Sequence, residues 1–246
     1  MPNDFVIFTR ARSGSNSLVS RLDSCPDVTC HPEIFKRGRI DIDRAYRRRL
    51  PSTRIAERDA GPVAFVAAIR ALDPQRHVGF KIFPPHIDGA PGVIAHIAAP
   101  ATRRIVLTRA PLDTYASFLR MRATGVHKLK AGESPPPEAL AARVRFAKPT
   151  FRRFAAGYNR FLAMGHLIAA IPGSFVIDYA QINDPDALDA LFGFVGSTAR
   201  AADSATAFRK QFAGSLEDGF ENWGELQDFL RTDPILLAAP PPSHRG

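Results

Sequence analysis

Residues 5–18, FVIFTRARSGSNSL, join an apolar run to a loop of Gly, Ser and Arg and then to the start of a helix. The run 5–8 contains branched and aromatic residues without interruption, which is typical of a strand buried in a parallel sheet. In a strand–loop–helix unit of this kind the loop N–H groups converge on one spot, and the helix dipole adds positive potential there. The stretch therefore predicts an α/β fold with an anion site at the carboxyl end of its first strand.

Short apolar runs and helical patterns alternate along the rest of the chain. Further strands are expected at 77–83, 104–108 and 174–179, and helices from 17 to 22, at 62–72, from about 111, over 137–170 with breaks near Pro149 and Gly165, at 184–194 and at 217–230. This alternation predicts a three-layer α/β fold with a mostly parallel central sheet. The charged stretch 36–60 is open to two interpretations, a mobile segment near the site or a solvated helix.

Composition limits the class of protein. The chain has 246 residues, 45% hydrophobic and 23% charged, so it can bury a core and is not globally disordered. Its net charge of +9 favours an anionic partner, although a coding bias toward Arg would produce the same excess. No run of 18 apolar residues occurs, the first residues do not read as a signal peptide, and Cys25 and Cys30 do not form a disulfide or zinc pattern. We expect a cytoplasmic protein without a metal.

The loop itself narrows the chemistry. The guanidinium of Arg12 and the hydroxyls of Ser13, Ser15 and Ser17 are suited to an anion cradle. The motif G-x-x-x-x-G-K-[ST] is missing, which disfavours an ATP or GTP hydrolase, and so is the dinucleotide motif G-x-G-x-x-G. The alternative is a Ser/Gly turn that only caps the following helix.

A second motif strengthens the anion interpretation. In residues 105–119, Arg109 stands at the end of an expected strand, and Ser117 follows eight residues later, about two turns into the next helix. An Arg at a strand end and a Ser in the following helix can grip one phosphate together.

These motifs occur in the order known from one family. Residues 12–18 resemble the 5′-phosphosulfate loop, and the spacing from Arg109 to Ser117 resembles the 3′-phosphate motif, of sulfotransferases that use 3′-phosphoadenosine-5′-phosphosulfate (PAPS). Residues 79–81 and 178–182 are similar to two further family segments, the second with Gln181 where an acid is usual. Residues 210–226 resemble the C-terminal pattern of bacterial carbohydrate sulfotransferases, which are closest in style to this sequence.

The resemblance implies a P-loop-like version of the three-layer fold. With no internal repeat and no clear linker, we expect a single sulfotransferase-like domain over 1–235, and the Pro-rich tail 236–246 is expected to be disordered. It implies PAPS as sulfo donor, PAP as product and no metal. Arg12 would stabilise the leaving phosphate electrostatically, because an Arg does not readily donate a proton. The residues that would bind the donor are Arg12, Ser13, Gly14, Ser15, Asn16, Ser17, Lys81, Arg109, Ser117 and Lys210.

The general base has three candidates. Carbohydrate and tyrosyl-protein sulfotransferases carry a Glu shortly after the phosphosulfate helix, and Glu33 stands at that place. Its alternative role is a surface acid or helix cap. Cytosolic relatives place a base His two residues after their strand Lys, whereas His86 follows Lys81 by five. His31, two residues before Glu33, is the third candidate.

The predicted function is transfer of a sulfo group from PAPS to a hydroxyl, with a carbohydrate or glycolipid as acceptor. A homodimer is compatible with the sequence, and a nucleic-acid partner is not expected. The alternatives are a P-loop-like kinase or phosphohydrolase, a non-catalytic anion- or nucleic-acid-binding protein, and an inactive sulfotransferase-like protein. Each alternative makes a different prediction for the binding of PAP, of Mg·ATP or of nucleic acid.

Overall fold

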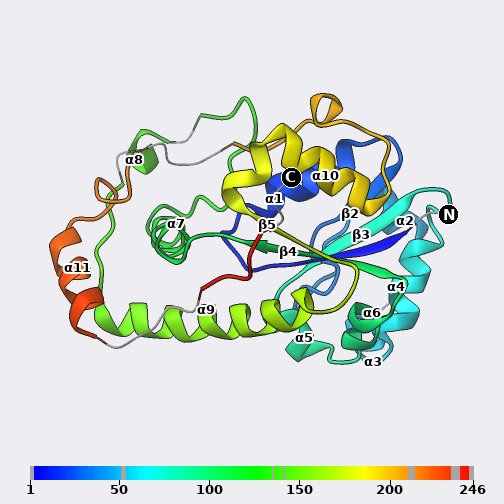
Figure 1. The fold of residues 1–246 in the computed structure, drawn as a ribbon, viewed down its shortest axis with the longest axis horizontal. Helices are drawn as coiled ribbons and strands as arrows, with labels where there is room; N and C mark the ends of the chain where they lie inside the picture. Colours follow the sequence, from blue (N-terminus) through cyan, green and yellow to red (C-terminus); the bar gives the residue numbers. More distant parts are fainter. Residues whose placement is uncertain are drawn as a thin grey trace.

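A single parallel sheet organises the chain (Figure 1). The computed structural model describes residues 3–50, 54–134, 136–140, 142–209, 214–233 and 239–243. The strands are β1 (Asp4–Phe8), β2 (Val28–His31), β3 (His77–Ile82), β4 (Thr102–Thr108) and β5 (Ser174–Asp178). Their order is β2-β3-β1-β4-β5, which places β1 in the middle of the sheet. Every neighbouring pair of strands is parallel.

Helices cover both faces of this sheet. They are α1 (Ser15–Ser24), α2 (Arg44–Arg49), α3 (Ile55–Ala60), α4 (Pro62–Arg70), α5 (Pro84–Gly89), α6 (Val93–Ala98), α7 (Pro111–Thr124), α8 (Pro137–Leu140), α9 (Lys148–Ala169), α10 (Pro185–Val195) and α11 (Trp223–Thr232), with 3-10 turns η1 (Tyr179–Asn183) and η2 (Ala201–Asp203).

The side chains of β1 divide the core into two layers. Phe5 and Ile7 are fully buried with residues of α1 and α10, whereas Val6 and Phe8 are fully buried with residues of α4, α6 and α9. This alternation follows from the period of two in a strand. Figure 1 shows α1 and α10 above the sheet and α9, α5 and α6 below it. The predicted three-layer α/β fold with a parallel central sheet is confirmed.

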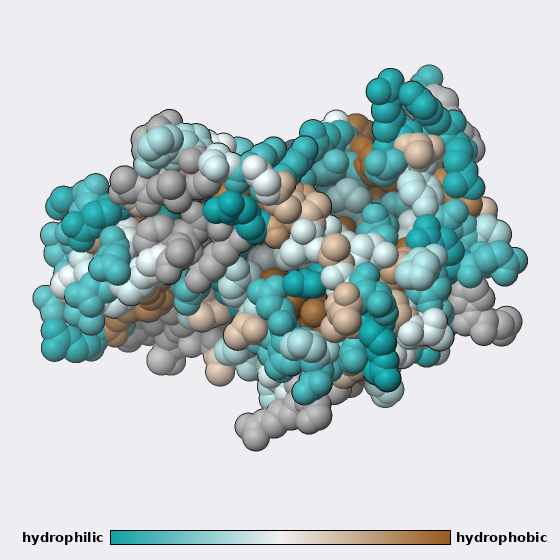
Figure 2. All heavy atoms as spheres, turned by 90° about the horizontal axis from the view of Figure 1, so that it is seen from above, coloured by the Kyte–Doolittle hydropathy of each residue, from teal (hydrophilic) through white to brown (hydrophobic). Residues whose placement is uncertain are grey.

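The upper face of the molecule is mixed in hydropathy. Figure 2, which views the molecule from above, shows hydrophilic residues toward both ends, with pale and apolar residues gathered in the middle. Of the described helices, none is long and apolar enough to cross a membrane.

Two expectations about local structure were wrong. The edge strand β2 was not anticipated, because Thr29 and His31 are polar residue types although both are buried. The helix α9 is continuous where breaks were expected. Pro149 lies in its first turn, where no helical N–H bond is lost. Gly165 is buried inside the helix, where a Cβ would lie 3.4 Å from Val106 of the sheet, an ordinary packing distance.

The charged stretch 36–60 contains two short helices, α2 and α3, rather than one solvated helix. The last helix, α11, begins at Trp223, later than expected. The single domain over 1–235 and the disordered tail at 236–246 stay predictions. Part of that tail lies outside the described residues, and within 239–243 the Ala239 carbonyl lies 2.8 Å from His166 Nε2.

Candidate donor and proton-transfer site

The loop between β1 and α1 has an unusual backbone. Arg12 has φ +73°, in the left-handed region, and Gly14 follows with φ +85° as the residue that caps α1. A non-glycine residue in this region costs free energy, and such residues often lie at functional sites. A Cβ at position 14 would lie 2.4 Å from Cδ2 of Tyr179, so only glycine fits there. The loop is therefore shaped by close approach of another segment as well as by its own turn.

The hydroxyls of this loop point in different directions. Ser13 is buried, and its Oγ lies 2.6 Å from Thr9 Oγ1 and donates to the Arg10 carbonyl at 2.7 Å. Ser17 Oγ instead lies 2.9 Å from Thr206 Oγ1. Ser13 thus stabilises the turn with its hydroxyl, which leaves its backbone N–H as the group it can offer to a ligand.

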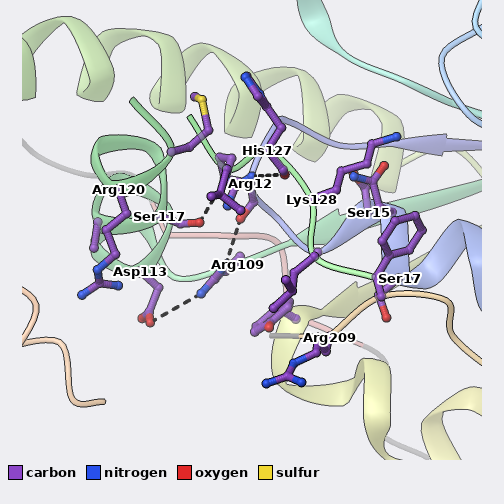
Figure 3. Close-up of a pocket in the computed structure, with 18 of the residues that line it drawn as sticks. Arg12, Ser15, Ser17, Arg109, Asp113, Ser117, Arg120, His127, Lys128 and Arg209 are labelled. Carbon is purple, nitrogen blue, oxygen red and sulfur yellow. Dashed lines mark hydrogen bonds and ion pairs between the residues drawn. The ribbon is translucent and has the colours of Figure 1, made fainter. Parts of the chain in front are cut away.

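The two motifs found in the sequence meet directly. Arg12 Nε donates to Ser117 Oγ at 3.0 Å and Arg12 Nη1 donates to the His127 carbonyl at 2.7 Å (Figure 3). Arg109 Nη1 donates to the Arg12 carbonyl at 3.0 Å. Burial, and next the charge of Arg109, lowers the pKa of Arg12 to about 10. Two guanidinium groups are therefore held close together, an arrangement that an anion would relieve.

Arg109 is positioned from two sides. Its guanidinium lies 4.1 Å from the centre of the Tyr179 ring, and the Tyr158 hydroxyl of α9 donates to its carbonyl at 2.5 Å. Its Nη2 lies 3.9 Å from Asp113. Its buried Nε has no hydrogen-bond partner among the described residues. A buried donor without a partner costs free energy, so this atom fits a site that receives an anionic oxygen.

These residues border a cavity of about 480 Å³ at the carboxyl edge of the sheet (Figure 3). Of the described residues that line it, five are Lys or Arg and one is acidic, Asp113. The loop contributes Gly14, Ser15, Asn16 and Ser17 to the lining. The cationic residues are Arg12, Arg109, Arg120, Lys128 and Arg209. The cavity therefore suits a ligand with more than one anionic group.

Several of these residues were missed by sequence reasoning. Arg120 was noticed but not singled out, and Lys128 and Arg209 were not considered. Arg209 precedes Lys210, which was predicted to bind the donor and which lies outside the described residues. Lys128 carries no local signal, because its contact with the cavity depends on the path of the loop after α7.

A second cluster adjoins the cavity through Asn16. Lys81 is buried at the end of β3, and its Nζ donates to Asn16 Oδ1 and lies 3.3 Å from Glu33 Oε1. The side chain of Glu33 is 15% exposed, and its Oε2 lies 3.6 Å from His86 Nε2 and 3.7 Å from Lys36 Nζ. Lys81 thus does not line the cavity itself but connects the loop to the carboxylate.

Glu33 and His86 were competing candidates for the base, and the structure brings them together. His86 Nδ1 accepts a hydrogen bond from the Phe83 N–H at 3.2 Å. The proton of a neutral imidazole then resides on Nε2, which faces Glu33. Burial lowers the pKa of His86 to about 4, so the ring is neutral at pH 7. In this tautomer His86 is a donor toward Glu33, which leaves Glu33 as the group that can accept a proton.

His31 lies in a different environment. Its ring contacts the edge of the Tyr46 ring, with 4.8 Å between ring centres, and burial lowers its pKa to about 4. Tyr46 donates to Asp73, which also accepts from Thr29 at 2.8 Å. These contacts fasten α2 to the edge of the sheet, so His31 belongs to the packing of that edge.

The loop that carries Glu33 is held by a buried arginine. Arg58 of α3 is 1% exposed, and its Nη1 donates to the carbonyls of Ile34, Lys36 and Arg39 at 3.0–3.1 Å. Arg58 also forms an ion pair with Asp59 at 2.7 Å. The charged stretch 36–60 therefore fixes the loop after β2 and is not merely solvated.

No group of three or more His, Cys, Asp and Glu side chains is arranged to hold a metal ion within the described ranges. The site combines the loop between β1 and α1, the adjacent guanidinium groups of Arg12 and Arg109, and the Glu33 carboxylate beside Lys81.

Comparison with known proteins bears on this arrangement. No protein-family model matches the sequence, and no curated protein matches it. The structure is similar to the sulfotransferase domain of the Synechococcus PCC 7002 olefin synthase, with a TM-score of 0.54 and 17% identity over 98% of this chain and 91% of the other.

Two other solved structures align with lower TM-scores. A sulfotransferase from Alicyclobacillus acidocaldarius gives 0.49 at 18% identity, over 95% of this chain and 92% of the other. Retinol dehydratase in complex with androsterone and inactive cofactor PAP gives 0.39 at 13% identity, over 95% and 82%. From the olefin synthase domain we conclude that the chain has the fold of the sulfotransferases.

Proposed function

We propose that the protein is a PAPS-dependent sulfotransferase acting on a hydroxyl group. The observation that carries this proposal is the cationic cavity in which Arg12 contacts both Ser117 and Arg109 at the end of the central strands. A donor with phosphate at its 3′ position and phosphosulfate at its 5′ position has the charge to match it. The sulfotransferase fold supports the same assignment.

The residues divide the chemistry between them. When bound, PAPS would supply the sulfo group: its S–O bond to the 5′-phosphate breaks with the electron pair left on phosphate, and the acceptor oxygen forms the new bond to sulfur. Arg12 and the loop amides would stabilise the leaving phosphate, and Arg109 with Ser117 would hold the 3′-phosphate. Glu33 would take the acceptor proton, and Lys81, whose Nζ lies 3.3 Å from Oε1, would hold the carboxylate in position.

The acceptor is a separate part of the proposal. We infer a carbohydrate or glycolipid hydroxyl, on the ground of the likeness of the motifs to those of bacterial carbohydrate sulfotransferases. A cytoplasmic location in a bacterium and a homodimer stay predictions.

The donor is tested by thermal unfolding with PAP, compared with Mg·ATP. We expect saturating PAP to raise the melting temperature by several degrees, since a ligand bound only to the folded state stabilises it. Stabilisation by Mg·ATP without stabilisation by PAP would instead favour a kinase or phosphohydrolase. The acceptor is tested by incubation with labelled PAPS and fractionated glycolipids or glycans, with mass detection of an added sulfo group.

A further inference from the structure

Lys128 lies in a loop that crosses the cavity. We call residues 126–131 the strap; it pairs with residues 206–209, where Arg209 N donates to the Leu129 carbonyl at 3.0 Å and Ala131 N donates to the Ala207 carbonyl at 2.8 Å. Lys128 lines the cavity from this strap. Figure 3 shows Lys128 toward Ser15 and Ser17 of the loop, with Arg120 and Asp113 at the opposite end.

Lys128 is exposed, and across the described residues its ammonium forms no ion pair. Its Nζ lies 5.8 Å from the centre of the Phe208 ring. Its charge nevertheless acts on Lys81: burial lowers the pKa of Lys81, Glu33 opposes the shift, and Lys128 lowers it further. Lys128 therefore lies within electrostatic reach of the group that connects the loop to Glu33.

The order of contacts defines where the sulfo group must lie. Asn16 in the loop accepts from Lys81, and Lys81 contacts Glu33. An acceptor hydroxyl must come within hydrogen-bond reach of Glu33 and attack sulfur from the side opposite the leaving phosphate. The sulfo group then lies between the loop and Glu33, on the side of the cavity that Lys128 faces.

We propose that the Lys128 ammonium binds the sulfo oxygens of the donor, so that the strap distinguishes PAPS from PAP. This inference rests on the proposed function. It assigns the remaining cations differently: Arg120 lies at the other end of the cavity, Arg109 lies between Arg120 and the loop, and both would meet phosphate, which PAPS and PAP share. Lys128 alone among these three would meet the group that only the donor carries.

The test is calorimetric titration of PAPS and of PAP without acceptor, on the wild type and on Lys128→Met. Loss of a charge-assisted hydrogen bond lowers affinity by about tenfold or more. We expect Lys128→Met to weaken the binding of PAPS by at least about tenfold and the binding of PAP by less than about twofold. Lys128→Arg keeps the positive charge and should therefore keep most of the difference in affinity between PAPS and PAP. Lys130→Met is the matched control, since Lys130 is exposed on the same strap but does not line the cavity.

The outcomes separate this inference from the proposed function. If the wild type binds neither nucleotide, the proposed function fails. If the wild type binds both and Lys128→Met weakens both equally, Lys128 binds a shared phosphate and the inference is overturned. Unchanged binding of both nucleotides, or an equal effect of Lys130→Met, overturns it as well.

Discussion

The cationic cavity and the cluster of Glu33, Lys81, Lys36 and His86 are connected through Asn16, which lines the cavity and accepts a hydrogen bond from Lys81. The two regions differ in how their charges are balanced. The cavity is lined by five cations and one acid, and Arg109 keeps a buried Nε without a partner among the described residues. In the cluster, Glu33 already contacts Lys81, Lys36 and His86. Among the described residues the first region thus carries an excess of positive charge, whereas in the second the carboxylate faces cationic and imidazole groups. This contrast is what we expect of a site that binds a charged nucleotide beside a site that handles one proton.

The largest effect should come from removing the proton acceptor. Glu33→Gln keeps the shape of the side chain but removes the carboxylate, so we expect turnover to fall by roughly 10²-fold or more. PAP affinity should stay within about twofold, because Glu33 does not line the cavity. Rates of sulfo transfer and PAP titrations measure the two effects. Unchanged turnover would remove Glu33 from the reaction and weaken the contrast between the regions.

Removing a cavity cation should act on binding. Arg109→Ala deletes the guanidinium that contacts the Arg12 carbonyl and the Tyr179 ring. We expect PAP affinity to fall by roughly 30-fold or more, since a charge-assisted contact with phosphate is lost. Arg122→Ala is the control, because Arg122 is exposed on α7 and lies outside the cavity lining. PAP affinity that stays within twofold in Arg109→Ala would place the 3′-phosphate elsewhere.

The backbone of the loop provides a third comparison. Gly14→Ala puts a Cβ against the Tyr179 ring at a residue with positive φ, so the loop or Tyr179 must shift. We expect a loss of about 1–3 kcal/mol in unfolding free energy, together with weaker PAP binding. Gly157→Ala is the control, because a Cβ at that position of α9 meets nothing within 4 Å. Denaturant unfolding measures the free energy of unfolding of the wild type and of both variants. A Gly14→Ala variant as stable as the wild type would show that the loop tolerates a side chain at position 14.

The smallest effect concerns pH and the Glu33 cluster. The folded-state pKa of His86, about 4, lies below the ~6.5 of an unfolded histidine, so protonation favours the unfolded chain. Its contribution to stability is full above pH ~6.5 and is lost as pH falls toward 4, by at most about 1.4 kcal/mol per pH unit. His86→Gln should reduce the slope of unfolding free energy against pH between about pH 4 and 6.5, because up to one proton fewer is taken up on unfolding. Replacing the exposed His127 with Gln is the matched control. An unchanged slope in His86→Gln would mean that His86 takes up its proton at the same pH in the folded and the unfolded chain.

How far the site was predictable depends on the distance between its parts along the chain. Arg12 with its loop, and Arg109 with Ser117, are each local patterns of a strand end and a helix, and both were recognised. Glu33 and His86 were treated as alternatives because sequence spacing cannot show that both reach one point. The structure makes them partners, since β2 and β3 are neighbours and end at the same edge.

The same limit explains the errors in the fold. β1, β3, β4 and β5 are apolar runs that any sheet would bury, and each was predicted. β2 was missed because the burial of Thr29 depends on Asp73, which lies more than forty residues away along the chain. Asp73 accepts a hydrogen bond from the Thr29 hydroxyl. Gly165 was taken as a helix break because glycine is a weak helix former, whereas in the fold it packs within α9 beside Val106 of β4.

The sequence by itself determined the α/β class, the Gly/Ser/Arg loop after the central strand and the position of Arg109 at a strand end eight residues before Ser117, because periodicity and turn chemistry act over a few residues. Only the tertiary structure decided that Arg12 contacts Ser117, that Lys81 links Asn16 to Glu33, and that Lys128 and Arg209 reach the cavity. These contacts join segments 48 to more than 100 residues apart. Their free energies depend on which strands are neighbours, and that order is a property of the whole packed core.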